Sequence, residues 1–165
     1  MEMDSRTKGE YVLAVFRILI GWIMLWPFFD KMFGLGFQTP AGSGFFEGGS
    51  PSSFVTFVSG GIFEDFYNSL AGNLAVDIIL LAALLILGVT LILGIASKLT
   101  TIGTVAFLVV MYSLHVPPTD NPLIDFRIIL SVGIVAVYLL DGFDYLSLNA
   151  KWKETWLVKK FPIFG

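Results

Sequence analysis

Cysteine is absent from this chain of 165 residues and histidine occurs once, and these absences exclude several classes of function. Without cysteine there is no disulfide, no thiolate metal site, no iron–sulfur cluster and no cysteine nucleophile. A single histidine excludes a haem held by two histidines of one chain. We therefore expect no haem, no iron–sulfur cluster and no metal ion. With no nucleotide-binding motif either, we expect no catalysis by this chain alone.

Charge is also scarce, at 14% of the residues, whereas soluble domains carry about 25%. The net charge is −3, and no basic run suits nucleic acid. Hydrophobic residues make up 56%, and the 17 glycines raise the apolar share to about two thirds. A chain of this size cannot bury that much apolar surface in one aqueous core. The composition predicts an integral membrane protein and excludes a disordered chain.

Four apolar stretches are each long enough to cross a bilayer, since a transmembrane helix takes about 17–25 residues. They cover residues 11–29, 74–96, 99–116 and 124–140. The pattern predicts an all-α fold, a four-transmembrane-helix bundle that forms one domain over residues 1–165. Lys and Arg gather before the first stretch, between the second and third, and after the fourth. By the positive-inside rule we expect a multi-pass protein of the cell membrane with both termini cytoplasmic.

The segment 32–73 between the first two stretches is too long for a simple hairpin. It opens rich in Gly and Phe, and Ser50 followed by Pro51 then favours a helix start. Apolar residues recur after it at helical spacing until Gly60 and Gly61 interrupt them. We expect a broken amphipathic extracytoplasmic segment. It forms either a lid over an outer cavity or an apolar loop packed on the bundle.

The C-terminal tail, residues 149–165, carries Trp152 and Trp156 among several lysines. Tryptophans four residues apart share one face of a helix. Aromatic side chains flanked by Lys are typical of a helix at a membrane interface. We expect a cytoplasmic interfacial helix on the inner leaflet, and the alternative is a solvated tail.

Ionisable residues inside apolar stretches are costly and are functional candidates by default. Arg17 lies inside the first stretch, on its cytoplasmic side, and Asp141 follows the inner end of the fourth. We predict a structural ion pair between Arg17 and Asp141. The alternative is that the Arg17 side chain extends to the inner interface.

A second polar level is expected near the outer face, because a rise of 1.5 Å per residue brings side chains of all four stretches to similar depth. Its predicted members are Trp26, Asp77, Tyr112 and Arg127, with Lys31 and His115 just above. We expect Asp77 to pair with Arg127. Tyr112, His115 and Arg127 offer donors to the head of a quinone. Trp26 offers a wall and Asp77 a proton relay. The alternative is a purely structural pair, with His115 among lipid head groups.

Several short motifs of this chain follow one arrangement. They are Arg17 with Gly21 and Lys31, the segment 94–98 from Gly to Lys, and Asn121-Pro122 followed by Asp125-Phe126-Arg127. The arrangement resembles the DoxX/DoxD family of four-helix membrane proteins over nearly the whole chain. Two departures are Phe28, where the family usually has Gly, and Arg127, where many members have His. The resemblance implies a small subunit of a quinone-linked oxidoreductase, such as thiosulfate:quinone oxidoreductase or an assembly around a terminal quinol oxidase.

The sequence therefore predicts a membrane subunit that binds quinone as its cofactor and anchors other subunits of a redox complex, or a second copy of itself. One alternative is a non-catalytic scaffold that recruits soluble redox proteins through the Lys-rich tail. Another is a small-solute or ion transporter built around Asp77 and Arg127. A quinone site requires an apolar channel that opens to lipid, whereas a transporter requires a path to both aqueous faces.

Overall fold

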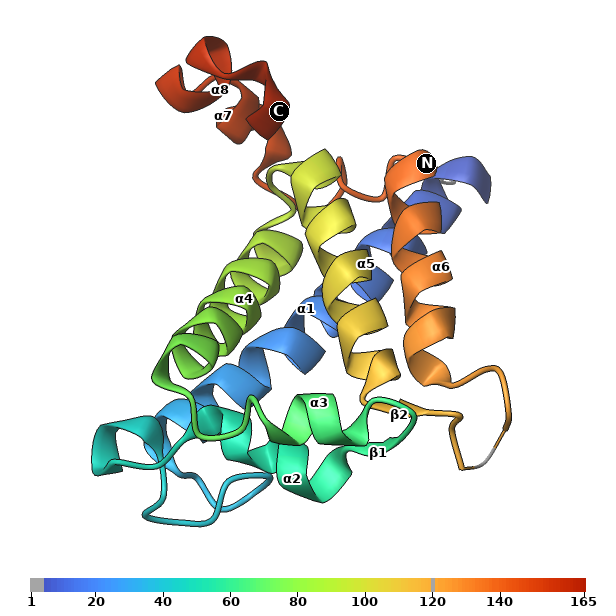
Figure 1. Ribbon diagram of the computed structural model, residues 1–165. Coiled ribbons are helices and arrows are strands. Elements are labelled where there is room, and N and C mark those ends of the chain that lie inside the picture. The colour runs from blue at the N-terminus through green and yellow to red at the C-terminus, as the bar shows by residue number, and fades with distance from the viewer. Residues whose placement is uncertain (1–4, 120) are drawn as a thin grey trace.

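The computed structural model describes residues 5–119 and 121–165, which are mainly helical (Figure 1). The four main helices are α1 (Ser5–Phe33), α4 (Leu74–Leu93), α5 (Ser97–Ser113) and α6 (Phe126–Leu139). Helix α1 packs mainly against α4, and α5 packs mainly against α6. The bundle therefore consists of two helix pairs.

Helices α1 and α4 are long and apolar enough to cross a membrane, whereas α5 and α6 are apolar but shorter, at 17 and 14 residues. The predicted fourth stretch, 124–140, is shorter as a helix because Asp125 begins it. The Asp125 carboxylate accepts hydrogen bonds from the backbone nitrogens of Arg127 and Ile128, so this residue is the N-cap. Asn121 accepts bonds from two amides of the preceding turn.

Two glycines allow α1 and α4 to approach closely. A Cβ added at Gly88 would lie 2.7 Å from the Cβ of Leu25, and one at Gly21 would lie 2.8 Å from Cγ1 of Ile92. Small residues at such crossings favour helix association in lipid. The buried core between the two helix pairs consists of Ile20, Met24, Leu91, Leu108, Ile134, Val137 and Phe143.

The segment that follows α1 is here called the lid segment and comprises residues 34–73, because α1 continues to Phe33. It contains the helices α2 (Val55–Val58) and α3 (Glu64–Asn68) and two 3-10 turns, at 45–47 and 51–54. Figure 1 shows it at one end of the main helices, opposite the start of α1 and the C-terminal helices. The break predicted at Gly60 and Gly61 is confirmed.

At that break the lid segment forms a short strand, which the sequence did not predict. Strand β1 (Gly60–Gly61) pairs in parallel with β2 (His115–Val116). The pairing replaces the last residues of the predicted helix 99–116, because α5 ends at Ser113. It joins the lid segment directly to the segment between α5 and α6.

The C-terminal tail forms two short helices in place of the single helix predicted. These are α7 (Asn149–Lys153) and α8 (Trp156–Lys160), with a 3-10 turn at 162–164. Trp152 and Trp156 lie on different helices. The indole Nε1 of Trp152 donates to the carbonyl of Phe164 at 2.6 Å, so the tail closes on itself, whereas Trp156 is 68% exposed.

Candidate functional site

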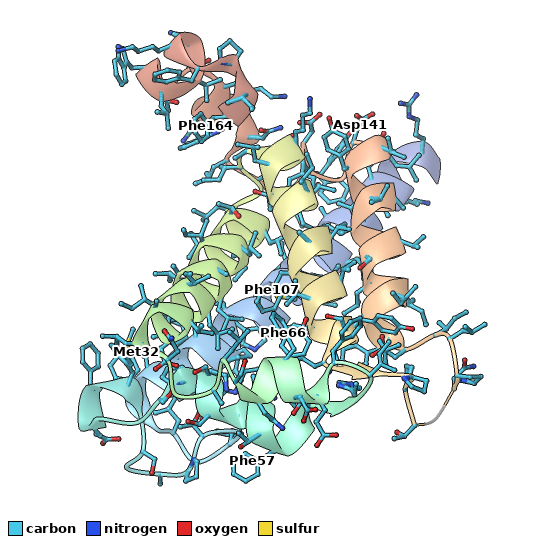
Figure 2. The ribbon with its side chains drawn as sticks, viewed as in Figure 1. Met32, Phe57, Phe66, Phe107, Asp141 and Phe164 are labelled. Carbon is cyan, nitrogen blue, oxygen red and sulfur yellow. The ribbon has the colours of Figure 1, made fainter. Side chains whose placement is uncertain are left out.

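A cavity of about 620 Å³ lies between the lid segment and the four main helices. This volume is within the range of small-molecule sites. Its apolar wall includes Met24 of α1, Leu80 and Leu84 of α4, and Phe107 and Met111 of α5. Figure 2 shows Phe107 extending from α5 toward the side of α1 and α4. The polar part of the wall comes mainly from the lid segment.

Lys31 lines this cavity near the C-terminal end of α1. The residue is 4% exposed, and its Nζ lies 4.3 Å from the centroid of the Phe54 ring. Within residues 5–119 and 121–165 the ammonium forms no hydrogen bond and no ion pair. The Lys31 charge is therefore in contact with an aromatic face of the lid segment and with the cavity.

The neighbouring Asp30 is also buried, and its carboxylate is fully engaged by the lid segment. Its oxygens accept hydrogen bonds from the backbone nitrogens of Phe37 at 3.2 Å, Gln38 at 2.9 Å and Thr39 at 2.7 Å. This residue was not among the predicted site residues. The Gly-rich loop that begins four residues after it was the only sequence signal for the contact. Asp30 fixes the start of the lid segment to α1.

Asp77, one turn into α4, holds a second point of the lid segment. Its Oδ1 accepts a hydrogen bond from the Ser52 backbone nitrogen at 2.6 Å and one from the Ser50 hydroxyl at 2.9 Å. The predicted ion pair between Asp77 and Arg127 is therefore wrong. The start of the 3-10 turn supplies the donors for Asp77, and Arg127 has an acidic partner on its own helix end.

The acidic partner of Arg127 is Asp125, whose Oδ2 lies 2.5 Å from Nη1 of the guanidinium. The same Nη1 lies 2.8 Å from Nε2 of His115. Because guanidinium only donates, a neutral His115 ring accepts at Nε2 and carries its proton on Nδ1. Burial lowers the pKa of His115, and the Arg127 charge lowers it further, while Asp125 and the Val58 carbonyl act in the opposite direction.

Of the six residues predicted to bind the quinone, Lys31 and Arg127 line the cavity, and the other four do not. Trp26 packs on Trp22 and, nearly at right angles, on Phe37, with ring centroids 5.8 and 5.0 Å apart. The Tyr112 hydroxyl donates to the carbonyl of Leu123 at 2.8 Å. Helix rise gives the depth of a residue but not its rotation about the helix axis, which decides whether it faces the cavity.

At the opposite end of the bundle, the predicted ion pair between Arg17 and Asp141 is also wrong. Arg17 is fully buried, and its Nη2 donates to the backbone carbonyls of Leu146 at 2.9 Å and Tyr145 at 3.2 Å. The exposed Asp141 carboxylate instead lies 3.9 Å from Nη2 of Arg6. The turn after α6 brings carbonyl oxygens, not a carboxylate, to the buried guanidinium. Figure 2 shows Asp141 at the end of α6.

Among the residues that the structure describes, the charged side chains lining the cavity are Lys31 and Arg127, and both are cations. In the same residues no group of three or more His, Asp or Glu side chains is placed to hold a metal ion. No family model, no curated protein and no solved structure matches the chain. What the chain does is therefore inferred from the cavity.

Proposed function

We propose that this chain is a four-span membrane protein of the DoxX/DoxD type that binds a quinone head in the cavity under the lid segment. It serves as a small subunit of a quinone-linked redox complex and anchors partner subunits. The observation that carries the proposal is an apolar cavity of about 620 Å³ with two cationic hydrogen-bond donors, Lys31 and Arg127, on different helices.

A quinone fits these residues by chemistry. Its ring requires apolar walls, which Phe107, Met111 and Leu84 offer. Its carbonyl oxygens require donors, and ammonium and guanidinium groups are donors only. When bound, a quinone supplies electron and proton acceptance. The residues of this chain bind and orient its head and exclude water from it.

The membrane topology belongs to the same proposal. The cytoplasmic side is the end at which α1 begins and the C-terminal helices lie, because that end carries most of the Lys and Arg. The lid segment then faces the extracytoplasmic side. A reporter fused at Ser43 is expected to behave as extracytoplasmic, and one fused at Gly165 as cytoplasmic. Protease access to the C-terminus from outside intact cells would contradict this topology.

The test of the ligand is purification in a mild detergent from native membranes, followed by extraction and mass spectrometric identification of bound quinone. We expect quinone in near-stoichiometric amount, and co-purifying redox subunits. A matched pair of variants is Lys31→Met, which removes a cavity cation, and Lys98→Met, which removes an exposed one. Quinone content no higher than that of an unrelated membrane protein purified in parallel would overturn the proposal.

A scaffold that recruits soluble redox proteins is the second candidate, because one observation favours it. The tail extends from the end of the bundle (Figure 1) with its lysines exposed: Lys151, Lys153, Lys159 and Lys160. Replacing all four with Gln is expected to release recruited partners without changing quinone content. Retention of the partners would exclude the scaffold role of the tail.

The transporter alternative receives no such support. A path to both aqueous faces would pass through the inner half of the bundle. There the fully buried Ile20, Leu91 and Ile134 pack against one another as part of the apolar core.

A further inference from the structure

Among the described residues, the side chains that line the cavity include positive charges and no negative charge, and this indicates what the cavity binds. No carboxylate among the described residues lines it, whereas Lys31 and Arg127 do. The carboxylates of Asp30 and Asp77 accept hydrogen bonds from the lid segment, and Asp125 pairs with Arg127. Arg127 is thus in direct contact with a carboxylate, whereas Lys31, within the part of the chain that the structure describes, is not: the neighbouring Asp30 acts on its charge without forming an ion pair with it.

An ammonium group removed from water is costly unless an anion and hydrogen-bond acceptors replace the water. The ring of Phe54 at 4.3 Å offers a partial substitute through its π face. The Phe54 ring has no oxygen or nitrogen acceptor for the three hydrogen bonds that the ammonium can donate. A ligand that brings an oxyanion to Lys31 would supply the hydrogen-bond acceptor that it lacks and a negative charge in direct contact with it.

We infer that the occupant of this cavity carries an oxyanion on an apolar body, and that the oxyanion binds the ammonium of Lys31. The inference rests on the cavity of the proposed function and deepens it by naming the chemistry of the head group. Among quinones it selects those with an ionised ring hydroxyl. A long-chain carboxylate offers the same chemistry on a different body.

The cavity has an apolar wall for the body of such a ligand and a polar wall for its oxyanion. The body lies against Leu80 and Leu84 of α4 and Phe107 of α5, which are apolar. The head lies at the lid side, where Lys31 is found and where polar groups such as Thr39 and Ser53 complete the wall. Ile23 and Phe126 line the cavity and are about half exposed, so the apolar body has exposed apolar residues beside it at the rim.

The experiment compares matched ligands on the full-length protein in lipid nanodiscs by isothermal titration calorimetry. The quinone pair is a 2-hydroxy-3-alkyl-1,4-naphthoquinone, which is an anion at neutral pH, and its neutral 2-methoxy analogue. The lipid pair is oleate and oleyl alcohol. Because hydrogen bonds to charged groups are the strong ones, we expect each anion to bind about ten- to a hundredfold more tightly than its neutral partner.

Three variants test whether the preference for the anionic ligand depends on Lys31. Lys31→Met keeps most of the length of the side chain and is expected to remove the preference for the anion, because it weakens binding of the anion much more than binding of the neutral analogue, which loses only a hydrogen bond to a neutral acceptor. Lys31→Arg keeps the charge and is expected to keep the preference. Lys98→Met, which removes an exposed charge at the start of α5, is the control and is expected to match the unchanged protein.

The outcomes separate the inference from the proposed function. If the neutral quinone binds as tightly as the anionic one, the inference is wrong and the quinone function stands. If neither quinone binds but oleate binds through Lys31, the quinone function is wrong and the inference stands. If Lys31→Met weakens an anion and its neutral partner equally, or if no ligand of either pair binds, the inference is overturned. The comparison within the unchanged protein holds even if Lys31→Met fails to fold.

Discussion

The carboxylate of Asp77 lies 2.6 Å from the backbone nitrogen of Ser52, and both residues are almost completely buried, at 3% and 0% exposure. This contact joins α4 to the first turn of the second 3-10 helix in the lid segment. The Ser52 hydroxyl in turn accepts a hydrogen bond from the backbone nitrogen of Gly72 at 3.0 Å. The Asp77 carboxylate therefore holds the lid segment directly at Ser52 and, through the Ser52 hydroxyl, at Gly72.

Removing this acceptor is expected to destabilise the fold. Asp77→Ala leaves the Ser52 nitrogen without a partner, and a buried group left unsatisfied costs about 1–3 kcal/mol of the free energy of unfolding. Asp77→Asn keeps an acceptor oxygen and is expected to cost less. Asp65→Ala, at an exposed position of α3, is the control. Unfolding in mixed micelles followed by circular dichroism measures the difference.

The same variants test the overturned ion pair. Because Asp77 and Arg127 have separate partners, the effects of Asp77→Ala and Arg127→Ala are expected to add within about 0.5 kcal/mol in a double-mutant cycle. A coupling free energy above about 1 kcal/mol would mean that the two side chains do interact.

The strand pairing between the lid segment and the segment after α5 can be tested with two glycines that share a backbone conformation. Gly61 and Gly72 both have φ of +77°, so replacing either with Ala introduces the same backbone strain. A Cβ at Gly61 would clash with the carbonyl of Val116, whereas one at Gly72 meets open space. Overpacking typically costs about 1–3 kcal/mol, so Gly61→Ala is expected to exceed Gly72→Ala by about that amount. Equal unfolding free energies would mean that β1 and β2 do not pair.

The pKa of His115 predicts how stability depends on pH. Its pKa in the folded protein is lowered from the ordinary value of 6.5, chiefly by burial, with a further contribution from Arg127. The unfolded chain therefore takes up a proton at a higher pH than the folded protein does. Stability from this residue is complete above pH 6.5 and is lost as the pH falls toward the folded pKa.

The measurement is the free energy of unfolding between pH 7.5 and 5.5 for the unchanged protein and for His115→Gln. Gln keeps an acceptor for Arg127 and does not titrate in this range. We expect the unchanged protein to lose more stability toward acid than the variant. Parallel pH profiles for the two proteins would contradict the placement of a neutral ring beside Arg127.

At the end of the bundle opposite the lid segment, Gly94 and Arg17 provide the most sensitive packing test. Gly94 ends α4 with φ of +68°, and a Cβ added there would clash with the Arg17 guanidinium. Backbone strain of about 1–2 kcal/mol and overpacking of about 1–3 kcal/mol are expected to combine in Gly94→Ala. The control is Gly9→Ala, since a Cβ at Gly9 meets nothing within 4 Å.

The clash itself can be separated from the backbone strain. Arg17→Leu shortens the side chain that a Cβ at Gly94 would meet, so Gly94→Ala is expected to cost less in the presence of Arg17→Leu than alone. If the cost is unchanged, the guanidinium does not lie against Gly94. The readout is again the free energy of unfolding in micelles.

The sequence predicted the helices and breaks better than the contacts between them, because helices and breaks depend on residues that are neighbours in the chain. Apolar runs fix where a helix lies, and the pair Gly60 and Gly61 fixes a break, because each is encoded by neighbours in the chain. Lys31 and Arg127 were predicted at the outer level and do line the cavity. Asp77 was predicted at the same level, but its partners lie 25 and 27 residues away in an irregular loop.

Two features lay beyond sequence reasoning for the same reason. The pairing of Gly60 with His115 joins residues far apart in the chain and involves only two residues of each strand, too few for an alternating pattern. The three amides that bind Asp30 belong to the backbone, which has no side-chain signature. Both contacts concern the lid segment, where turn chemistry rather than hydrophobic periodicity decides the structure.

The lid segment is bonded to both helix pairs, and it therefore connects the ends of the main helices on its side of the bundle. Asp30 and Asp77 hold it to α1 and α4, while the Tyr67 hydroxyl bonds to the Ser113 hydroxyl at the end of α5, next to the strand pairing. Movement of α4 away from α5 at this end therefore requires breaking the hydrogen bonds that hold the lid segment to one of the two helices. At about 1 kcal/mol for each hydrogen bond, these contacts add to the free energy needed to separate the two helices.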